Sequence, residues 1–196
     1  LLAHAGNLKP SDLNRQILMT AEGLGKSRVA TASRRLRELN PRLEVVAIPE
    51  NISPANAETL VAQADIVFGC APLFPERFAL NDACLKLGKP LVDAAMYDLE
   101  GQVTTMVPGV TSCLRCRYPE LPSQWRREFP VIGAVSATAA SLAAMEGIKL
   151  LAGMGGNLLD VLLFFDLREM IFRRIPLTRR PDCPACAAVL PINQKT

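Results

Sequence analysis

The sequence has few aromatic residues, a single histidine and only a small excess of positive charge. Aromatic residues make up 5% of the 196 residues, so the core must be built mainly from Leu, Ala, Val and Ile. The only histidine, His4, has no evident partner, which leaves Ser–His or Cys–His catalysis with little support. The net charge of +3 is too small to favour nucleic acid or an anionic membrane as a partner.

The sequence also shows no secretory signal and no uninterrupted membrane span. Its first residues are too few for the apolar region of a signal peptide and have no basic start. The longest apolar stretch is interrupted by Glu146 and Lys149, whereas a membrane helix needs about 20 apolar residues. We therefore expect a cytoplasmic protein, in which cysteines are more often metal ligands or spectators than a disulfide framework.

What is present is the composition of a folded domain, with 49% hydrophobic and 21% charged residues. Apolar strand-like runs alternate with helical patterns, which favours an α/β fold with a mostly parallel sheet and flanking helices. The pattern predicts helices over residues 24–39, 75–87 and 131–153, and the runs V-L-L-F-F-D and M-I-F-R-R-I-P-L predict a C-terminal β-hairpin. Because no repeat or linker is evident, we expect a single domain over residues 1–196.

Four of the six cysteines form two Cys-x-x-Cys pairs, Cys113 with Cys116 and Cys183 with Cys186. Each such loop presents two thiolates at one corner of a tetrahedron, so two loops can complete a structural zinc site that joins the end of the chain to its middle. A redox pair with one activated thiol, or two pairs that share no site, are the alternatives. The remaining two cysteines lie in apolar runs and are expected to be buried core thiols: Cys70 and Cys84.

Charged residues gather just before the first predicted helix: Asp12, Arg15, Lys26 and Arg28. Basic groups at such a place can clamp phosphates. The alternative is a solvated entrance to the helix, which composition alone favours.

Several short motifs follow one another along the chain: S-D-L-N-R-Q, G-K-S-R, R-R-L-R-E-L-N-P, E-R-F-A-L-N-D-A-C, E-G-Q-V-T-T-M-V-P-G-V-T-S-C-L-R-C, V-I-G-A-V with M-E-G-I-K-L-L-A-G, and C-P-A-C. Each motif is weak by itself, but the ordered series is specific and covers essentially the whole chain. It resembles the E1-like activating enzymes, the group of ThiF, MoeB and HesA proteins and ubiquitin-activating enzymes.

The resemblance implies a Rossmann-like homodimer with a structural four-cysteine zinc site. Enzymes of this group bind ATP and Mg²⁺ and adenylate the C-terminal carboxylate of a small ubiquitin-like protein, often a sulfur carrier. The acyl-adenylate is then attacked by a thiol or sulfide donor. A carboxylate is a poor electrophile until its oxygen becomes a good leaving group, and cations offset the charge that develops during transfer.

Position by position, the resemblance implies catalytic roles for Arg15 and Arg77. Arg28 falls where the group has its ATP-binding lysine, and Lys26, two residues earlier, is an alternative. The implied nucleotide-binding residues are Arg15, Gln16, Lys26, Arg28 and Asn81, and the implied zinc ligands are Cys113, Cys116, Cys183 and Cys186.

The sequence departs from the group's pattern at several positions. The glycine-rich phosphate loop is expected upstream of residue 1, and His4-Ala5-Gly6 stand where the group has its ribose-binding D-x-D. Pro72 stands where an Asp binds Mg²⁺, and proline cannot bind a cation through its side chain. Between Cys116 and Val131 the sequence has no cysteine for thiol catalysis; that loop carries Trp125, Arg126 and Arg127.

These departures keep three functions open. The first is an adenylyltransferase acting on a ubiquitin-like sulfur carrier. The second is a non-catalytic E1-like module that binds a carrier or partner protein, which Pro72 and the missing D-x-D motivate. An NAD(P)-dependent oxidoreductase is the third, but it would need a dinucleotide fingerprint and an acidic ribose ligand, and the sequence shows neither. Without the phosphate loop, we expect residues 1–196 to bind ATP poorly.

Overall fold

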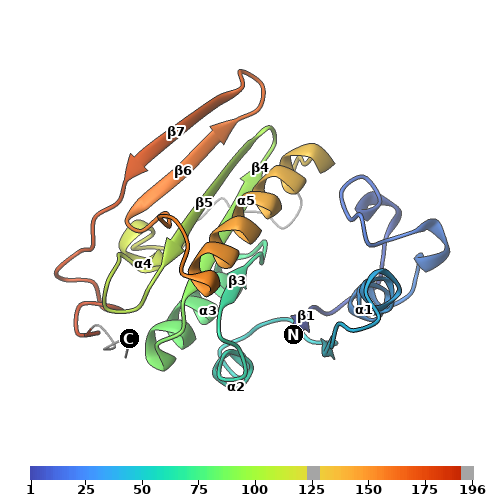
Figure 1. The fold of residues 1–196 in the computed structure, drawn as a ribbon, viewed down its shortest axis with the longest axis horizontal. Coiled ribbons are helices and arrows are strands. Elements are labelled where there is room, and N and C mark those ends of the chain that lie inside the picture. Colours follow the sequence, from blue (N-terminus) through green and yellow to red (C-terminus); the bar gives the residue numbers. More distant parts are fainter. Residues whose placement is uncertain (123–128, 191–196) are drawn as a thin grey trace. The chain divides into compact units, whose positions relative to one another are not determined.

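The computed structural model describes residues 1–122 and 129–190. Contacts between Cα atoms divide the chain into two compact units, Leu1–Ile52 and Ser53–Thr196. Figure 1 shows their elements, and each unit is described by itself.

The first unit contains two short parallel strands, β1 (Leu2–Ala3) and β2 (Ala47–Ile48), joined through α1 (Arg28–Leu39). One-turn 3₁₀ helices, η1 (Pro10–Asp12) and η2 (Ala21–Gly23), lie between β1 and α1. Ser27 caps α1, because its hydroxyl accepts the Ala30 backbone N–H at 3.4 Å. The helix begins later than residue 24 because Gly25 has a φ of +76°, which a right-handed helix cannot contain.

The second unit is built on a five-stranded sheet in the order β3-β4-β5-β6-β7. Its strands are β3 (Val67–Gly69), β4 (Leu91–Tyr97), β5 (Glu100–Met106), β6 (Val161–Asp166) and β7 (Ile171–Pro176). The α/β Rossmann-like class is confirmed, and β6 and β7 form the predicted C-terminal hairpin.

The pairings differ between the two ends of the chain. Strands β1 and β2, and strands β3 and β4, pair in parallel, as the alternation of strands and helices predicts. From β4 onward the pairings are antiparallel. Between β4 and β5 the antiparallel pairing follows from a two-residue connection, in which Asp98 has a φ of +54°; a parallel crossover needs a connection of a dozen or more residues.

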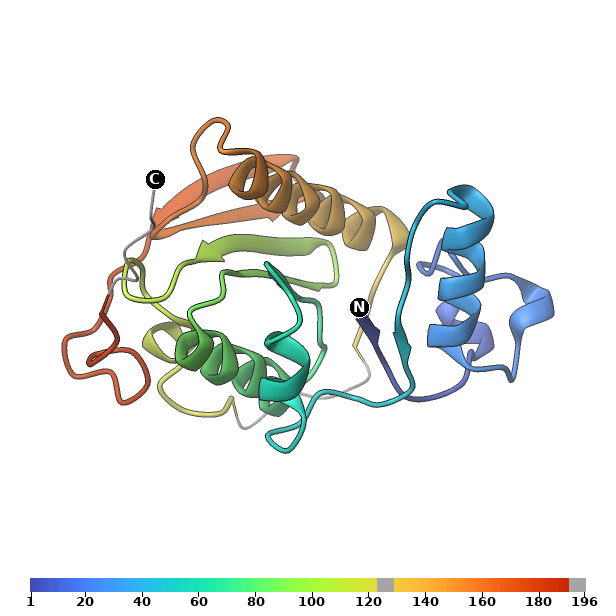
Figure 2. The ribbon, with the colours of Figure 1, turned by 60° about the horizontal axis from the view of Figure 1, so that its bottom comes forward.

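Helices cover both faces of this sheet, as Figure 2 shows. Helix α5 (Gly133–Ala152) packs on β4 and β5, while α3 (Phe74–Leu87) contacts β3 and β4 from the other side and packs against α2 (Ala57–Val61). Two of the three long predicted helices, 75–87 and 131–153, therefore match α3 and α5 within two residues at each end. Gly88 and Gly153, both in the left-handed conformation, terminate them.

The core of the second unit lies between α5 and the sheet. Val92 and Val103 are fully buried against Ala143, and Phe165 packs against Ala139, one turn earlier in α5. Gly101 on β5 leaves the space that the Phe165 ring fills, because a Cβ there would lie 2.1 Å from the ring. Gly101 on β5 and Ala139 on α5 thus leave room for the large Phe165 side chain of the neighbouring strand.

Helix α5 is long and apolar enough to cross a membrane by length and composition alone. Only 28% of its most apolar 18-residue window is buried. It nevertheless contacts β4 and β5, and Glu146 is buried at its contact with β5, where Thr105 donates to the carboxylate at 2.7 Å. These contacts make α5 a layer of the α/β fold.

Candidate functional site

Both Cys-x-x-Cys pairs meet in the second unit. The Sγ atoms of Cys113, Cys116, Cys183 and Cys186 all lie within 4.8 Å of one another, and all four residues are buried. The Sγ–Sγ distances are 3.9 Å within the first pair, 3.7 Å from Cys113 to Cys183, and 3.4 Å from Cys116 to Cys186. Zn–S bonds of about 2.3 Å in a tetrahedron place sulfur atoms about 3.8 Å apart, so the four thiols fit one zinc ion.

Burial and hydrogen bonding shift the pKa values of these thiols in different directions. Burial raises the pKa of Cys186 to about 11 and raises the pKa of Cys113 further. Burial alone would also raise the pKa of Cys183, but the backbone N–H groups of Ala185 and Cys186 outweigh it and lower the value to about 7. Four adjacent thiols can all ionise only beside a cation, which is the environment that zinc supplies.

Side chains from other elements hold the first cysteine loop. Asn81 on α3 accepts the backbone N–H of Leu114, the first residue of α4 (Leu114–Arg117), at 2.9 Å. Asp160, just before β6, accepts the backbone N–H of Ser112 at 2.7 Å. Asn81, which the resemblance places beside a nucleotide, is therefore bonded to the thiol cluster's own loop.

Arg77 lies in the interior of the second unit. Its guanidinium donates to both carboxylate oxygens of Asp93 on β4, at 3.2 Å from Nε to Oδ1 and 2.6 Å from Nη2 to Oδ2. It also lies over the Phe74 ring, 4.8 Å from the ring centre. Sequence reasoning missed Asp93, although one acidic residue inside the apolar run P-L-V-D-A-A was a signal for a buried ion pair.

In the first unit, the predicted phosphate-binding arginines meet at one buried carboxylate. Asp12 lies 3.1 Å from Arg15 Nη2 and 3.4 Å from Arg28 Nε. Arg28 Nη1 is also 3.4 Å from Nε2 of His4, which directly follows β1. Two guanidinium groups therefore share one carboxylate, and the cluster keeps a positive charge.

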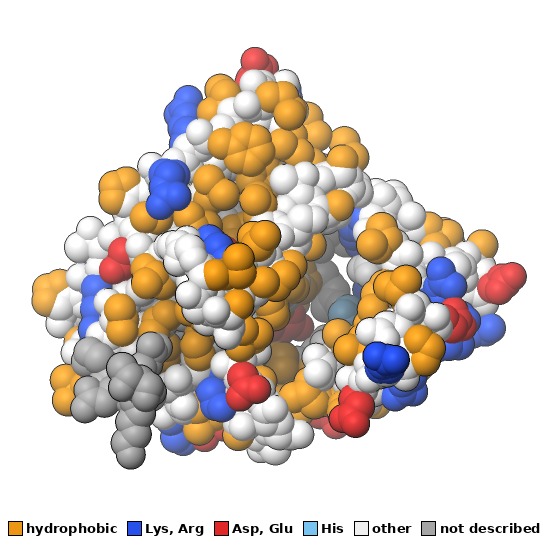
Figure 3. Space-filling view, in the orientation of Figure 1, with side chains coloured by type: hydrophobic (Ala, Val, Ile, Leu, Met, Phe, Trp, Pro, Cys, Tyr) orange, Lys and Arg blue, Asp and Glu red, His pale blue; other side chains and the backbone are white. Residues whose placement is uncertain are grey.

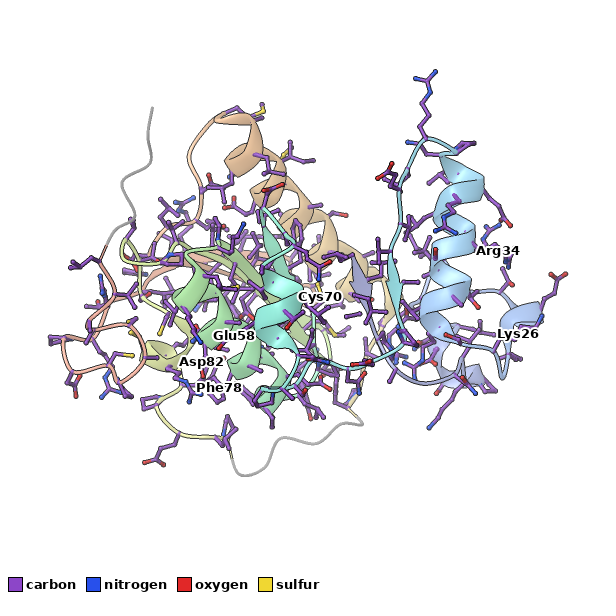
Figure 4. The ribbon with its side chains drawn as sticks, turned by 90° about the horizontal axis from the view of Figure 1, so that it is seen from below. Lys26, Arg34, Glu58, Cys70, Phe78 and Asp82 are labelled. Atoms are coloured by element: carbon purple, nitrogen blue, oxygen red, sulfur yellow. The ribbon has the colours of Figure 1, made fainter. Side chains whose placement is uncertain are left out.

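Two other predicted nucleotide-binding residues lie in the same unit as this cluster. Gln16 follows Arg15 and is partly exposed, while Lys26 is exposed in the loop before α1, where Figure 4 labels it. Arg15, Gln16, Lys26 and Arg28 lie in one unit, and Arg77 and Asn81 lie in the other.

Two further positions correct or limit the sequence-based expectations. Cys70 is exposed and not a buried core thiol, because it lies beyond Gly69, the last residue of β3 (Figure 4), whereas Cys84 is buried as expected. Pro72 follows in the loop before α3 and has no side-chain oxygen, so it cannot replace the Mg²⁺-binding Asp that the resemblance implies at this position. Trp125, Arg126 and Arg127 lie outside the described residues.

Comparisons with known proteins agree with these motifs. The model of the ThiF family matches residues 5–185. Protein HesA of Nostoc sp. is 45% identical over 95% of this chain and 74% of its own length. A sulfur carrier protein adenylyltransferase of Thermus thermophilus is 37% identical over 90% of this chain and 68% of its own length. The crystal structure of E. coli MccB with ATP matches at a TM-score of 0.81 and 23% identity, over 94% of this chain and 57% of MccB, which supports the fold.

Proposed function

Because this chain belongs to the ThiF family, we propose that it adenylates the C-terminal carboxylate of a ubiquitin-like sulfur-carrier protein. The observation that carries the proposal is the similarity to a sulfur carrier protein adenylyltransferase, which extends over nearly the whole chain. The ordered motifs and the cationic cluster of Arg15 and Arg28 support it.

The proposed reaction joins the carrier to AMP. A carboxylate oxygen of the carrier attacks the α-phosphorus of ATP, the bond from that phosphorus to the bridging oxygen breaks, and pyrophosphate leaves. The product is an acyl-adenylate, whose carbonyl carbon a sulfur nucleophile can attack because AMP is a good leaving group.

The chain's own residues would act mainly by positioning charge. Asp12 fixes the guanidinium groups of Arg15 and Arg28, and their remaining positive charge suits a polyphosphate. A preformed cluster loses little side-chain freedom when the nucleotide arrives, because the ion pairs already restrict both arginines. In this proposal Gln16 and Lys26 lie at the edge of the same site.

The four thiols would hold zinc in a structural role. Four protein ligands leave no open position for water, so bound zinc would neutralise the thiolates and fix the C-terminal loop after β7. The chemistry of adenylation would stay with the arginines.

We also propose a cytoplasmic homodimer. Large apolar side chains remain exposed along one side of α5, and Figure 3 shows hydrophobic side chains on the molecular surface. The exposed members on and just after α5 are Met145, Ile148, Leu151 and Met154. Apolar surface of this kind favours burial against another protein surface.

Carrier-dependent exchange between pyrophosphate and ATP tests the enzymatic proposal. The full-length protein, incubated with ATP, Mg²⁺ and candidate ubiquitin-like carriers, should exchange label only with a carrier that has a free C-terminal carboxylate. A carrier lacking its last residues is the control. Absence of exchange with every carrier would overturn the proposal.

The second candidate is a non-catalytic module that binds a carrier or partner protein. The neutralised Arg77 and the proline at position 72 favour it. Calorimetry with ATP separates the two, since ATP binding that requires Mg²⁺ supports the enzyme, and carrier binding without any ATP binding supports the module.

A further inference from the structure

Arg179 joins the two cysteine loops through backbone carbonyl groups. Among the described residues, its hydrogen bonds go to carbonyl oxygens and to no sulfur atom. Its Nη1 donates to the carbonyl of Gly109 at 2.8 Å, four residues before Cys113. Its Nη2 donates to the carbonyls of Cys186, Val189 at 2.7 Å and Ala187 at 3.4 Å. One guanidinium therefore bridges the turn before the first pair and the turn that contains the second.

The second turn brings several carbonyl oxygens close to one another. The N–H of Ala187 bonds the carbonyl of Cys183 at 3.0 Å, and the N–H of Val189 bonds the carbonyl of Cys186 at 3.0 Å, which winds the chain tightly. The carbonyls of Cys186, Ala187 and Val189 all lie within hydrogen-bonding distance of Arg179 Nη2. A cation with several N–H groups satisfies them together, and such charge-assisted bonds are stronger than neutral ones.

We propose that Arg179 is a positioning residue for the metal, which holds the two Cys-x-x-Cys loops in register before the ion binds. This inference depends on the four thiols binding zinc. With both loops tied to one side chain, the thiols meet at near-tetrahedral spacing and metal binding has less loop ordering to complete.

The geometry requires arginine at this position. The two terminal nitrogens serve different loops, Nη1 the Gly109 turn and Nη2 the turn of Cys186. Lysine keeps the charge but has one nitrogen on a flexible stem and cannot hold the same fork. The sequence offers no signal for this role, because Arg179 and Arg180 are adjacent and identical in type.

That neighbour provides the matched control. The Arg180 side chain pairs with exposed Asp182, at 3.2 Å and 2.9 Å, and its backbone N–H lies 3.4 Å from Cys116 Sγ. Arg180→Ala removes a cationic side chain one residue away and keeps that backbone contact. It should weaken zinc binding much less than a change at Arg179 does.

The experiment compares Arg179→Lys, Arg179→Met and Arg180→Ala with the unaltered protein. Zinc affinity is measured by competition with a chromophoric chelator, and Co²⁺ absorption reports the ligand set. We expect both Arg179 variants to bind zinc about 10–100-fold more weakly, with the same tetrahedral thiolate spectrum at saturation. In metal-free protein, a thiol reagent should modify their cysteines faster than those of Arg180→Ala.

Two different results would overturn the inference, one by removing the role of the bridge and the other by removing the metal site. Unchanged zinc affinity and unchanged thiol reactivity in both Arg179 variants would show that the bridge does not position the loops. Failure of the unaltered protein to bind zinc or Co²⁺ would remove the metal site itself. Neither result bears on carrier adenylation, which the exchange assay measures separately.

Discussion

Arg77 and Asp93 form a bidentate ion pair in the interior of the second unit, with 2% and 1% of their side chains exposed. The carboxylate neutralises an arginine that the resemblance to E1-like enzymes makes catalytic. A phosphate or carboxylate of a substrate would therefore have to compete with Asp93 for this guanidinium.

Removing one member of the Arg77–Asp93 pair should strongly lower the free energy of unfolding. Asp93→Asn leaves a buried guanidinium without its countercharge, and we expect unfolding free energy to fall by about 3–5 kcal/mol in urea titrations. The double variant Arg77→Met with Asp93→Leu should be closer to the unaltered protein. Equal or larger loss in the double variant would show that packing, and not charge, dominates at this position.

Arg28 and Lys26 should differ in their importance for nucleotide chemistry. Arg28 is fixed by Asp12, whereas Lys26 is exposed, so Arg28→Ala should lower carrier-dependent exchange by about 100-fold or more and Lys26→Ala should change it little. Arg28→Lys tests whether charge alone suffices. The reverse ranking would assign the phosphate contact to Lys26.

Zinc removal should loosen the end of the chain. Cys183→Ser is expected to lower bound zinc well below one ion per chain and to reduce the melting temperature, because structural zinc contributes directly to folding. Cys70→Ser, at an exposed cysteine, is the control and should keep both the bound zinc and the melting temperature. A Cys183→Ser protein that loses zinc yet melts at the same temperature would contradict the structural role.

Stability should depend on pH through Glu146. Burial acts to raise its pKa, but hydrogen bonds from Lys149, the Leu158 backbone and Thr105 outweigh burial and lower the pKa below 4.5. A lowered native pKa gives a stabilising contribution that is present above about pH 4.5 and is lost as the pH falls through the native value. Glu146→Gln should flatten this acid limb in urea titrations at several pH values, whereas Glu58→Gln, at an exposed ion pair, should not.

The sequence predicts the helices and strands better than it predicts how the strands pair. The apolar runs indicate the strands and the hairpin of β6 and β7, and cysteine spacing indicates that four thiols could meet. The antiparallel pairing of β4 with β5 depends on the short turn at Asp98, which periodicity does not reveal.

Long-range side-chain partners were also beyond prediction. Asp93 pairs with a residue 16 positions away, and Asn81 bonds a backbone N–H 33 positions away. Each contact depends on where α3 crosses the sheet and the cysteine loop. The pattern of residue types in one sequence does not reveal where α3 crosses the sheet.

The most direct test of the proposed function is mass spectrometry of the carrier after incubation with enzyme, ATP and Mg²⁺. The full-length protein should produce a carrier whose C-terminal peptide has gained AMP, and this adduct should disappear when hydroxylamine or a thiol is added. A carrier that binds the protein tightly but never gains AMP would contradict the adenylation proposal and assign the chain to a binding role.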